Sequence, residues 1–257
     1  MVIIWIAVIG LMIGSFLNVC IARIPAGESI ISPGSRCPSC RAPIAWYDNL
    51  PVISYLVLGG RCRACQARIS ARYPIVELVT AVAFVLVGLV FWPNVWMVAQ
   101  RLVFTALLIA LFGTDLDVQR LPDVLTLPGL VAGLLFSLVT GPGIVSALVG
   151  AALGAALPAF VRWIWKRATG VDGMGLGDVK MLAMIGAFLG WQQVWVVLFL
   201  ASASGAIIGL SLVAARRRSL QTRLPFGTFL AIAAYIAALV GDSLLSWYLH
   251  FFPMGSP

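Results

Sequence analysis

The sequence predicts an all-α polytopic membrane protein with about eight transmembrane helices. Of its 257 residues, 61% are hydrophobic and 10% are charged, and the mean hydropathy is +1.04. Such values are typical of membrane proteins and not of soluble domains. The net charge of +8 comes from basic residues scattered among the loops between apolar runs. This placement sets membrane topology, so it does not indicate a nucleic-acid partner.

The first apolar run, 2–21, predicts a retained helix and not a cleaved signal peptide. No basic segment precedes it and no small-residue cleavage site follows it. The other runs, most of them near the ~20 residues that cross a membrane, are 74–92, 96–114, 124–138, 144–164, 179–190, 194–215 and 225–249. The fourth and sixth spans are short, and where such Gly-rich spans lie beside acidic residues we expect broken or shielded helices. We divide the chain into the first helix (1–23), a polar loop (24–73) and a membrane domain (74–250).

The basic residues predict the orientation of these spans. If the N-terminus lies outside the cytoplasm, the loops on the inside hold the arginines of 23–72, Arg120, Arg162, Lys166, Arg167, Lys180, the arginines of 216–218 and Arg223. Only Arg101 then falls on the outside. The positive-inside rule therefore favours an even number of spans with both termini periplasmic. The single histidine, His250, lies near the end of the last span as an interfacial residue, which excludes most histidine-dependent hydrolase mechanisms.

Four cysteines in the polar loop predict a metal site. Cys37 and Cys40 form one CxxC pair, and Cys62 and Cys65 form a second after twenty-one intervening residues. Two such pairs supply four thiolates for tetrahedral zinc. With all four positions filled, the metal is structural, and the loop between the first and second spans is zinc-ribbon-like. Free or redox-active thiols are the alternative, and a cytoplasmic location disfavours disulfides.

Two acidic stretches are the candidate catalytic residues. Asp178 follows Gly175 and Gly177 at the start of the sixth span, and Asp115 ends the third span. The orientation puts both at the cytoplasmic ends of their helices. Two carboxylates in a poorly solvated site share a proton, so one can activate water while the other polarises a carbonyl group. The glycines suggest positive φ and a close backbone approach.

Purely structural roles for the acidic residues remain possible alternatives. Asp178 can be a helix N-cap, Asp115 and Asp178 can pair with arginines or with Lys180, and Asp117 can be a solvated loop charge. Asp123, behind Pro122, suits the positive end of the fourth span. Inside the first span, the sequence indicates that Asn18 binds a neighbouring helix or takes part in a site and that Cys20 is a small packing residue.

Together these motifs resemble the bacterial type IV prepilin peptidases, which are also N-methyltransferases. Besides the two CxxC pairs, the match includes 14–19 (GSFLNV), 23–25 (RIP), 46–55 (WYDNLPVISY), 72–77 (RYPIVE), Asp115 with 121–123 (LPD), and 175–178 (GLGD) followed by Lys180. It covers nearly the whole chain. The tetrapeptide GLGD alone is a weak signal, but this set in this order is highly specific.

The resemblance implies a GxGD-type intramembrane aspartic peptidase of the bacterial inner membrane. Its catalytic pair matches Asp115 and Asp178, with Gly175, Gly177 and Lys180 as supporting residues. Its substrates are type IV prepilins and the pseudopilins of type II secretion, whose basic leader is cut at the cytoplasmic face after a glycine. Many members then methylate the new N-terminus with S-adenosylmethionine, an activity associated with the zinc loop.

Two competing functions and one residue role remain open at this stage. The chain can be a peptidase whose zinc loop only docks substrate or stiffens the fold. It can also be a non-enzymatic scaffold or transporter, although few polar residues lie within the spans. Glu77, at the start of the second span, suits a methyltransferase role, a helix-interface role or an ion pair with Arg72.

Overall fold

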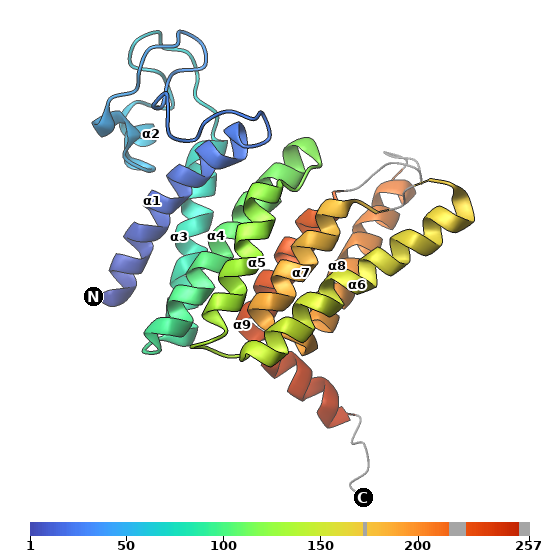
Figure 1. Cartoon of the computed structure of the whole chain (residues 1–257). Helices are drawn as coiled ribbons and strands as arrows, with labels where there is room; N and C mark the ends of the chain where they lie inside the picture. Colours follow the sequence, from blue (N-terminus) through green and yellow to red (C-terminus); the bar gives the residue numbers. More distant parts are fainter. Residues whose placement is uncertain (172–173, 216–224, 252–257) are drawn as a thin grey trace, which may run out of the picture. The chain divides into compact units, whose positions relative to one another are not determined.

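The computed structural model describes residues 1–171, 174–215 and 225–251. In this part of the chain the fold consists of helices, with isolated bridges between Arg36 and Pro43 and between Arg61 and Arg68 in place of strands. The elements are α1 (Val2–Arg23), η1 (Trp46–Asn49), α2 (Ile53–Val57), α3 (Arg72–Phe91), α4 (Val95–Val118), α5 (Asp123–Phe136), α6 (Ile144–Thr169), α7 (Leu176–Leu189), α8 (Trp191–Ala214) and α9 (Phe226–Phe251) (Figure 1). Gly173, the basic cluster of 216–218 with Arg223, and the tail 252–257 lie outside the described residues.

The long helices confirm the predicted membrane architecture. Each of the eight predicted spans coincides with one helix, and six of these helices, α1, α3, α4, α6, α8 and α9, are long and apolar enough to cross a membrane. The other two, α5 and α7, have 14 residues each and are the spans that the sequence marks as short. Every residue from Met181 to Leu189 of α7 is buried, because α5, α6, α8 and α9 all contact this helix. Neighbouring helices thus shield α7, as expected, but not α5, whose Val124, Val131 and Leu135 are exposed.

The chain forms two compact units, Met1–Val98 and Ala99–Pro257. In the first, α1 packs along α3 at a short distance that only small residues permit. A Cβ atom on Gly10 would lie 2.6 Å from the Cα atom of Ala81. Asn18 lies buried in this interface and donates from Nδ2 to the carbonyl of Tyr73 at 3.1 Å, which confirms its predicted interhelical role. Cys20 is buried, as expected of a packing residue.

The core of the second unit surrounds α7. The rings of Phe104 on α4 and Phe188 on α7 stack with centroids 4.7 Å apart, and α6 approaches α7 through Gly150, where a Cβ atom would lie 2.4 Å from the carbonyl oxygen of Gly186. The chain runs up and down through this unit. As a result, the C-terminal end of α4 meets the N-terminal ends of α5, α7 and α9 (Figure 1). The predicted acidic residues lie at this end.

Candidate active site and metal centre

Asp115 lies in the last turn of α4 and is 4% exposed. Its Oδ2 accepts a hydrogen bond of 2.8 Å from the backbone N–H of Thr228, and the N–H of Gly227 also donates to it. These amides belong to the first turn of α9, where backbone N–H groups have no acceptor within their own helix. Asp115 therefore caps the N-terminus of α9, and the positive end of that helix dipole favours the negative charge of the carboxylate.

Asp178 lies in the first turn of its own helix. It is the third residue of α7 and half-buried, and the backbone N–H of the N-cap residue, Gly175, donates to its carboxylate. An acidic side chain at this position reaches back to the N-cap amide in the manner of a capping box. The N-cap residue is thus Gly175 and not Asp178. Asp178 lies inside the first turn and accepts the hydrogen bond of the N-cap amide.

The two acids lie near each other. Their carboxylates are close enough to repel each other electrostatically. Leu121 lies between the backbone segments that surround the two acids. A Cβ atom on Gly177 would lie 2.8 Å from the Cβ atom of Leu121, and one on Gly227 would lie 3.1 Å from its Cδ1. Residues far apart in sequence thus gather at one end of the second unit, as the orientation argument requires.

The predicted roles of the two glycines need a correction. Gly175 has φ −71°, and Gly177 is not among the described residues with positive φ, so neither adopts the left-handed conformation that we expected. The close approach is real only at Gly177, which has Leu121 against it. At Gly175 a Cβ atom would meet the Oδ2 of Asp178 at 3.2 Å.

Lys180 pairs with an acid other than the two candidates. Its Nζ lies 2.7 Å from both carboxylate oxygens of Asp123, so it connects α7 to the first residue of α5. The predicted alternative in which Lys180 pairs with Asp115 or Asp178 is therefore wrong. Asp117 is exposed, in contrast to Asp115.

Sequence reasoning missed three residues that build this site. Thr228 and Gly227 supply the amides that bind Asp115, and a Cβ atom on Gly227 would lie 2.8 Å from the Oδ2 of Asp115. Arg162, on α6, donates to the carbonyl of Met174 just before α7. A glycine in the first turn of a helix, directly after Pro225 and Phe226, is the one signal that could have drawn attention to Gly227.

The four loop cysteines converge as predicted. Their sulfur atoms all lie within 4.8 Å of one another, and the Sγ atoms of Cys37 and Cys65 are 3.8 Å apart. Four thiolates at about 2.3 Å from a central zinc ion lie about 3.8 Å from one another. The cluster therefore fits a tetrahedral metal ion with no open position, which is the geometry of a structural site.

The two halves of this cluster repeat each other. The backbone N–H of Cys37 donates to Ala42 and that of Arg41 donates to Cys37; after a shift of 25 residues, Cys62 donates to Ala67 and Gln66 to Cys62. The repeat is visible in the sequence as RCPSCRAPI and RCRACQARI, a signal that we missed. Each half is a knuckle whose turn requires positive φ, at Arg41 and at Gln66.

Neighbouring groups shift the thiol pKa values of the cluster in opposite directions. The backbone N–H groups of Cys40 and then Ser39 lower the pKa of the Cys37 thiol to about 6. The pKa of Cys65 is raised to about 11 although the N–H of Ala67 lowers it, because contacts with the other sulfurs and burial outweigh that bond. Four thiolates at this spacing need a positive charge between them.

Glu77 lies at the interface between α1 and α3. It is 7% exposed, and a Cβ atom on Gly14 of α1 would lie 2.7 Å from its Cα. Its Oε2 accepts a hydrogen bond of 2.7 Å from the backbone N–H of Val52 in the polar loop, and Ser15 bonds its carboxylate as well. Glu77 therefore joins the polar loop to the helix pair.

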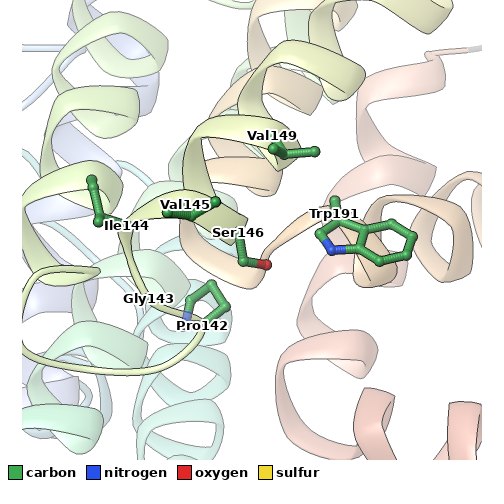
Figure 2. Close-up of a pocket in the computed structure, with 7 residues that line it drawn as sticks. All are labelled: Pro142, Gly143, Ile144, Val145, Ser146, Val149 and Trp191. Atoms are coloured by element: carbon green, nitrogen blue, oxygen red, sulfur yellow. The ribbon is translucent and has the colours of Figure 1, made fainter.

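One cavity of about 380 Å³ lies away from these residues. Figure 2 shows Pro142, Ser146 and Trp191 around it, at the starts of α6 and α8. Gly190, which follows the last residue of α7, approaches Pro142 and Ser146, so the cavity is about 18 Å along α7 from Asp178 at 1.5 Å per residue. It is not a candidate cleft for chemistry at the acids.

Comparisons with known proteins identify the family. Residues 8–91 match the bacterial peptidase A24 N-terminal domain and residues 102–210 match the type IV leader peptidase family. The prepilin leader peptidase/N-methyltransferase of Aeromonas salmonicida is 44% identical over 93% of this chain and 91% of its own length. The chain belongs to the prepilin leader peptidase/N-methyltransferase family.

Other relatives support this assignment at similar coverage. The family members of Pseudomonas aeruginosa and Neisseria gonorrhoeae are 40% and 37% identical, each over 95% of this chain and over 92% and 93% of their own lengths. No solved structure matches the chain significantly. The N-terminal match holds the four cysteines and Glu77, and the leader peptidase match holds Asp115, Asp178 and Lys180. The resemblance drawn from the sequence motifs is confirmed.

Proposed function

We propose that this chain cleaves the leader peptide of type IV prepilins and type II pseudopilins with Asp115 and Asp178 as an aspartyl dyad. One observation carries the assignment: two carboxylates from distant helices lie close together at one end of the second unit, and the nearby Lys180 pairs with Asp123 instead of with either of them. Carboxylates held in an ion pair would be poor proton shuttles. These two can exchange protons with substrate and water.

The hydrogen bonds suggest a division of roles within the dyad. Asp115 faces two backbone N–H donors at the start of α9, an arrangement that favours the carboxylate form. We assign it the task of taking a proton from the attacking water. Asp178, with one amide donor, holds the proton that goes to the scissile carbonyl oxygen. Collapse of the tetrahedral intermediate then passes the first proton from Asp115 to the leaving amine and returns a hydroxyl proton of the intermediate to Asp178, so the dyad is restored and one water is consumed per peptide bond.

The second proposed step is methylation of the new N-terminus. S-adenosylmethionine supplies a methyl group to the freed amine, which loses a proton. The four cysteines, filled by zinc, hold the loop of residues 24–73 in shape and leave no coordination position for chemistry. We place the enzyme in the bacterial inner membrane, with both termini periplasmic and the zinc loop and the dyad on the cytoplasmic side, where the basic leader of the substrate lies.

The test is cleavage of a purified prepilin by Asp115→Asn and Asp178→Asn, with Asp117→Asn as the matched control. Each asparagine keeps the shape of the side chain but cannot cycle a proton. We expect loss of cleavage in the first two variants and near-normal rates in the third, whose side chain is exposed. Zinc content and thermal unfolding report the fold. Cleavage by either of the first two variants at the wild-type rate would refute the dyad.

A further inference from the structure

The polar loop exposes an apolar surface that its role as a metal site does not explain. It lies on η1 and α2, and we call residues 46–57 the apolar arm. Its exposed side chains include Trp46 at 79%, Leu56 at 71% and Val57 at 75%. Large apolar side chains that gather on an otherwise polar segment mark a binding surface. Figure 1 shows α2 beside the ends of α1 and α3 between which the loop runs.

Glu77 fixes the depth of this arm. The backbone N–H of Val52, in the middle of the arm, donates to Glu77 at 2.7 Å. Glu77 is the sixth residue of α3, so it lies about 7.5 Å along the helix from Arg72 at 1.5 Å per residue. Because helix side chains lean toward the N-terminus, the middle of the arm lies beside the first turns of α3.

In these first turns α3 already exposes an apolar face. The helix is one of the six candidate membrane spans, and its side away from α1 exposes Ile75, Leu78, Val79 and Val82. These residues recur at the three- and four-residue spacing of one helix face. Ile75 precedes Glu77, so the apolar stripe starts above the hydrogen bond to the arm. A segment held at this level is at the bilayer interface.

The arm is held in one conformation at a cost in backbone strain. Val52 has φ 60° and ψ −47°, and the N–H of Ile53 donates to the carbonyl of Pro51 at 2.6 Å. This is a γ-turn with positive φ, which is rare and strained, above all for a β-branched residue. Ser54 donates from its hydroxyl to Tyr47 at 2.9 Å and ties α2 back to η1. The bond to Glu77 compensates the strained turn.

The surroundings of the arm match a lipid surface of negative charge. Trp46 and Tyr47 are amphipathic rings of the kind found at headgroup level. Between α1 and α3, residues 24–71 contain five arginines against one glutamate and one aspartate. Arginine side chains close to a membrane bind anionic headgroups.

We propose that the apolar arm inserts into the interfacial layer of the lipid bilayer. Ile53, Leu56 and Val57 reach the upper acyl chains, and Trp46 and Tyr47 lie among the headgroups. The zinc loop is then fixed to the membrane at three points, through α1, α3 and the arm. Glu77 acts as the positioning residue that sets the depth of the arm.

A photocrosslinking experiment tests this proposal on the full zinc-loaded chain. Benzoylphenylalanine is placed at Val57, and in a control protein at Ser39, an exposed position on the first cysteine knuckle. Both proteins are reconstituted into vesicles of phosphatidylethanolamine and phosphatidylglycerol, irradiated, and analysed by mass spectrometry for lipid adducts. We expect an adduct yield about tenfold higher at Val57, because an interfacial apolar segment contacts acyl chains and a solvated knuckle does not. Equal yields would overturn the proposal.

Two further measurements distinguish lipid from other binding partners and test the role of the positioning residue. With prepilin added, the lipid adduct at Val57 should persist; its replacement by a prepilin adduct would make the arm a substrate-docking surface and overturn the proposal. Glu77→Ala should lower the lipid yield at Val57 severalfold, while Glu77→Gln, which keeps an acceptor for the Val52 N–H, should retain it. Zinc content confirms the loop fold in each variant. An unchanged yield in Glu77→Ala would show that Glu77 does not set the depth.

Discussion

Gly227→Ala is the perturbation that most sharply tests the geometry around Asp115. A Cβ atom at this position would lie 2.8 Å from Oδ2 and 2.9 Å from Cγ of Asp115. Ordinary contact begins at 3.4 Å, so the carboxylate must move by at least 3.4 − 2.8 = 0.6 Å. That movement strains its bond to the N–H of Thr228, which is 2.8 Å long. A 1 Å error in a catalytic group can cost about a hundredfold in rate, so we expect cleavage to fall about ten- to a hundredfold.

The expected change in stability is smaller than the change in rate. Overpacking costs about 1–3 kcal/mol, and the better helix propensity of alanine returns up to about 1 kcal/mol. Gly205→Ala on α8 is the matched control, because its Cβ would meet the ring of Phe229 at an ordinary 3.7 Å. Initial rates of prepilin cleavage and thermal unfolding, measured on both variants, separate the two effects. Cleavage by Gly227→Ala at the wild-type rate would refute the placement of Asp115 in the reaction.

Three further perturbations extend the test. Gly177→Ala should slow cleavage about tenfold or more while Gly175→Ala has a small effect, since only the first puts a Cβ within 3.0 Å of another side chain's Cβ; equal rates would contradict this. Cys62→Ser should lose zinc and methyl transfer while cleavage persists, by metal analysis and the two assays; retained methylation would leave the loop without that role. Arg63 lowers the pKa of Asp48 by a hydrogen bond and by its charge, so this pair should stabilise the loop above the unfolded aspartate pKa of about 3.9 and lose that effect as pH falls through the lower folded value. Tryptophan fluorescence of wild type and Asp48→Asn against pH should then differ at neutral pH and converge in acid.

Much of the architecture could be predicted because it depends on local pattern. A run of apolar residues long enough for the bilayer is a helix wherever it lies, since unpaired backbone groups are too costly in lipid. The CxxC pairs converge because each short knuckle brings two sulfurs to one side. That Asp115 and Asp178 lie at the same end of the second unit followed from counting spans and from the placement of basic residues.

The contacts that the sequence did not reveal are those set by tertiary packing. Thr228 bonds Asp115 across 113 positions, and Lys180 reaches Asp123 across 57. The hydrophobic periodicity of a sequence does not show which helix N-termini meet at one end of a bundle. The acidic partner of Lys180 could therefore not be predicted from among the several acidic residues. The expected positive φ at Gly175 and Gly177 failed for a related reason: the glycines there make room for Asp178 and Leu121, which lie against them in space.

The arrangement of charges at this end of the second unit follows one physical rule. Three carboxylates each lie at the N-terminus of a helix: Asp123 at the first residue of α5, Asp178 in the first turn of α7, and Asp115 against the first turn of α9. Helix N-termini favour negative charge without supplying a mobile cation. Lys180 pairs with Asp123, so the lysine links α5 to α7, while the partners of the other two acids among the described residues are helix amides. A dyad supported by fixed dipoles can gain and lose a proton at membrane depth, whereas one locked to a lysine or arginine would hold its charge through the reaction.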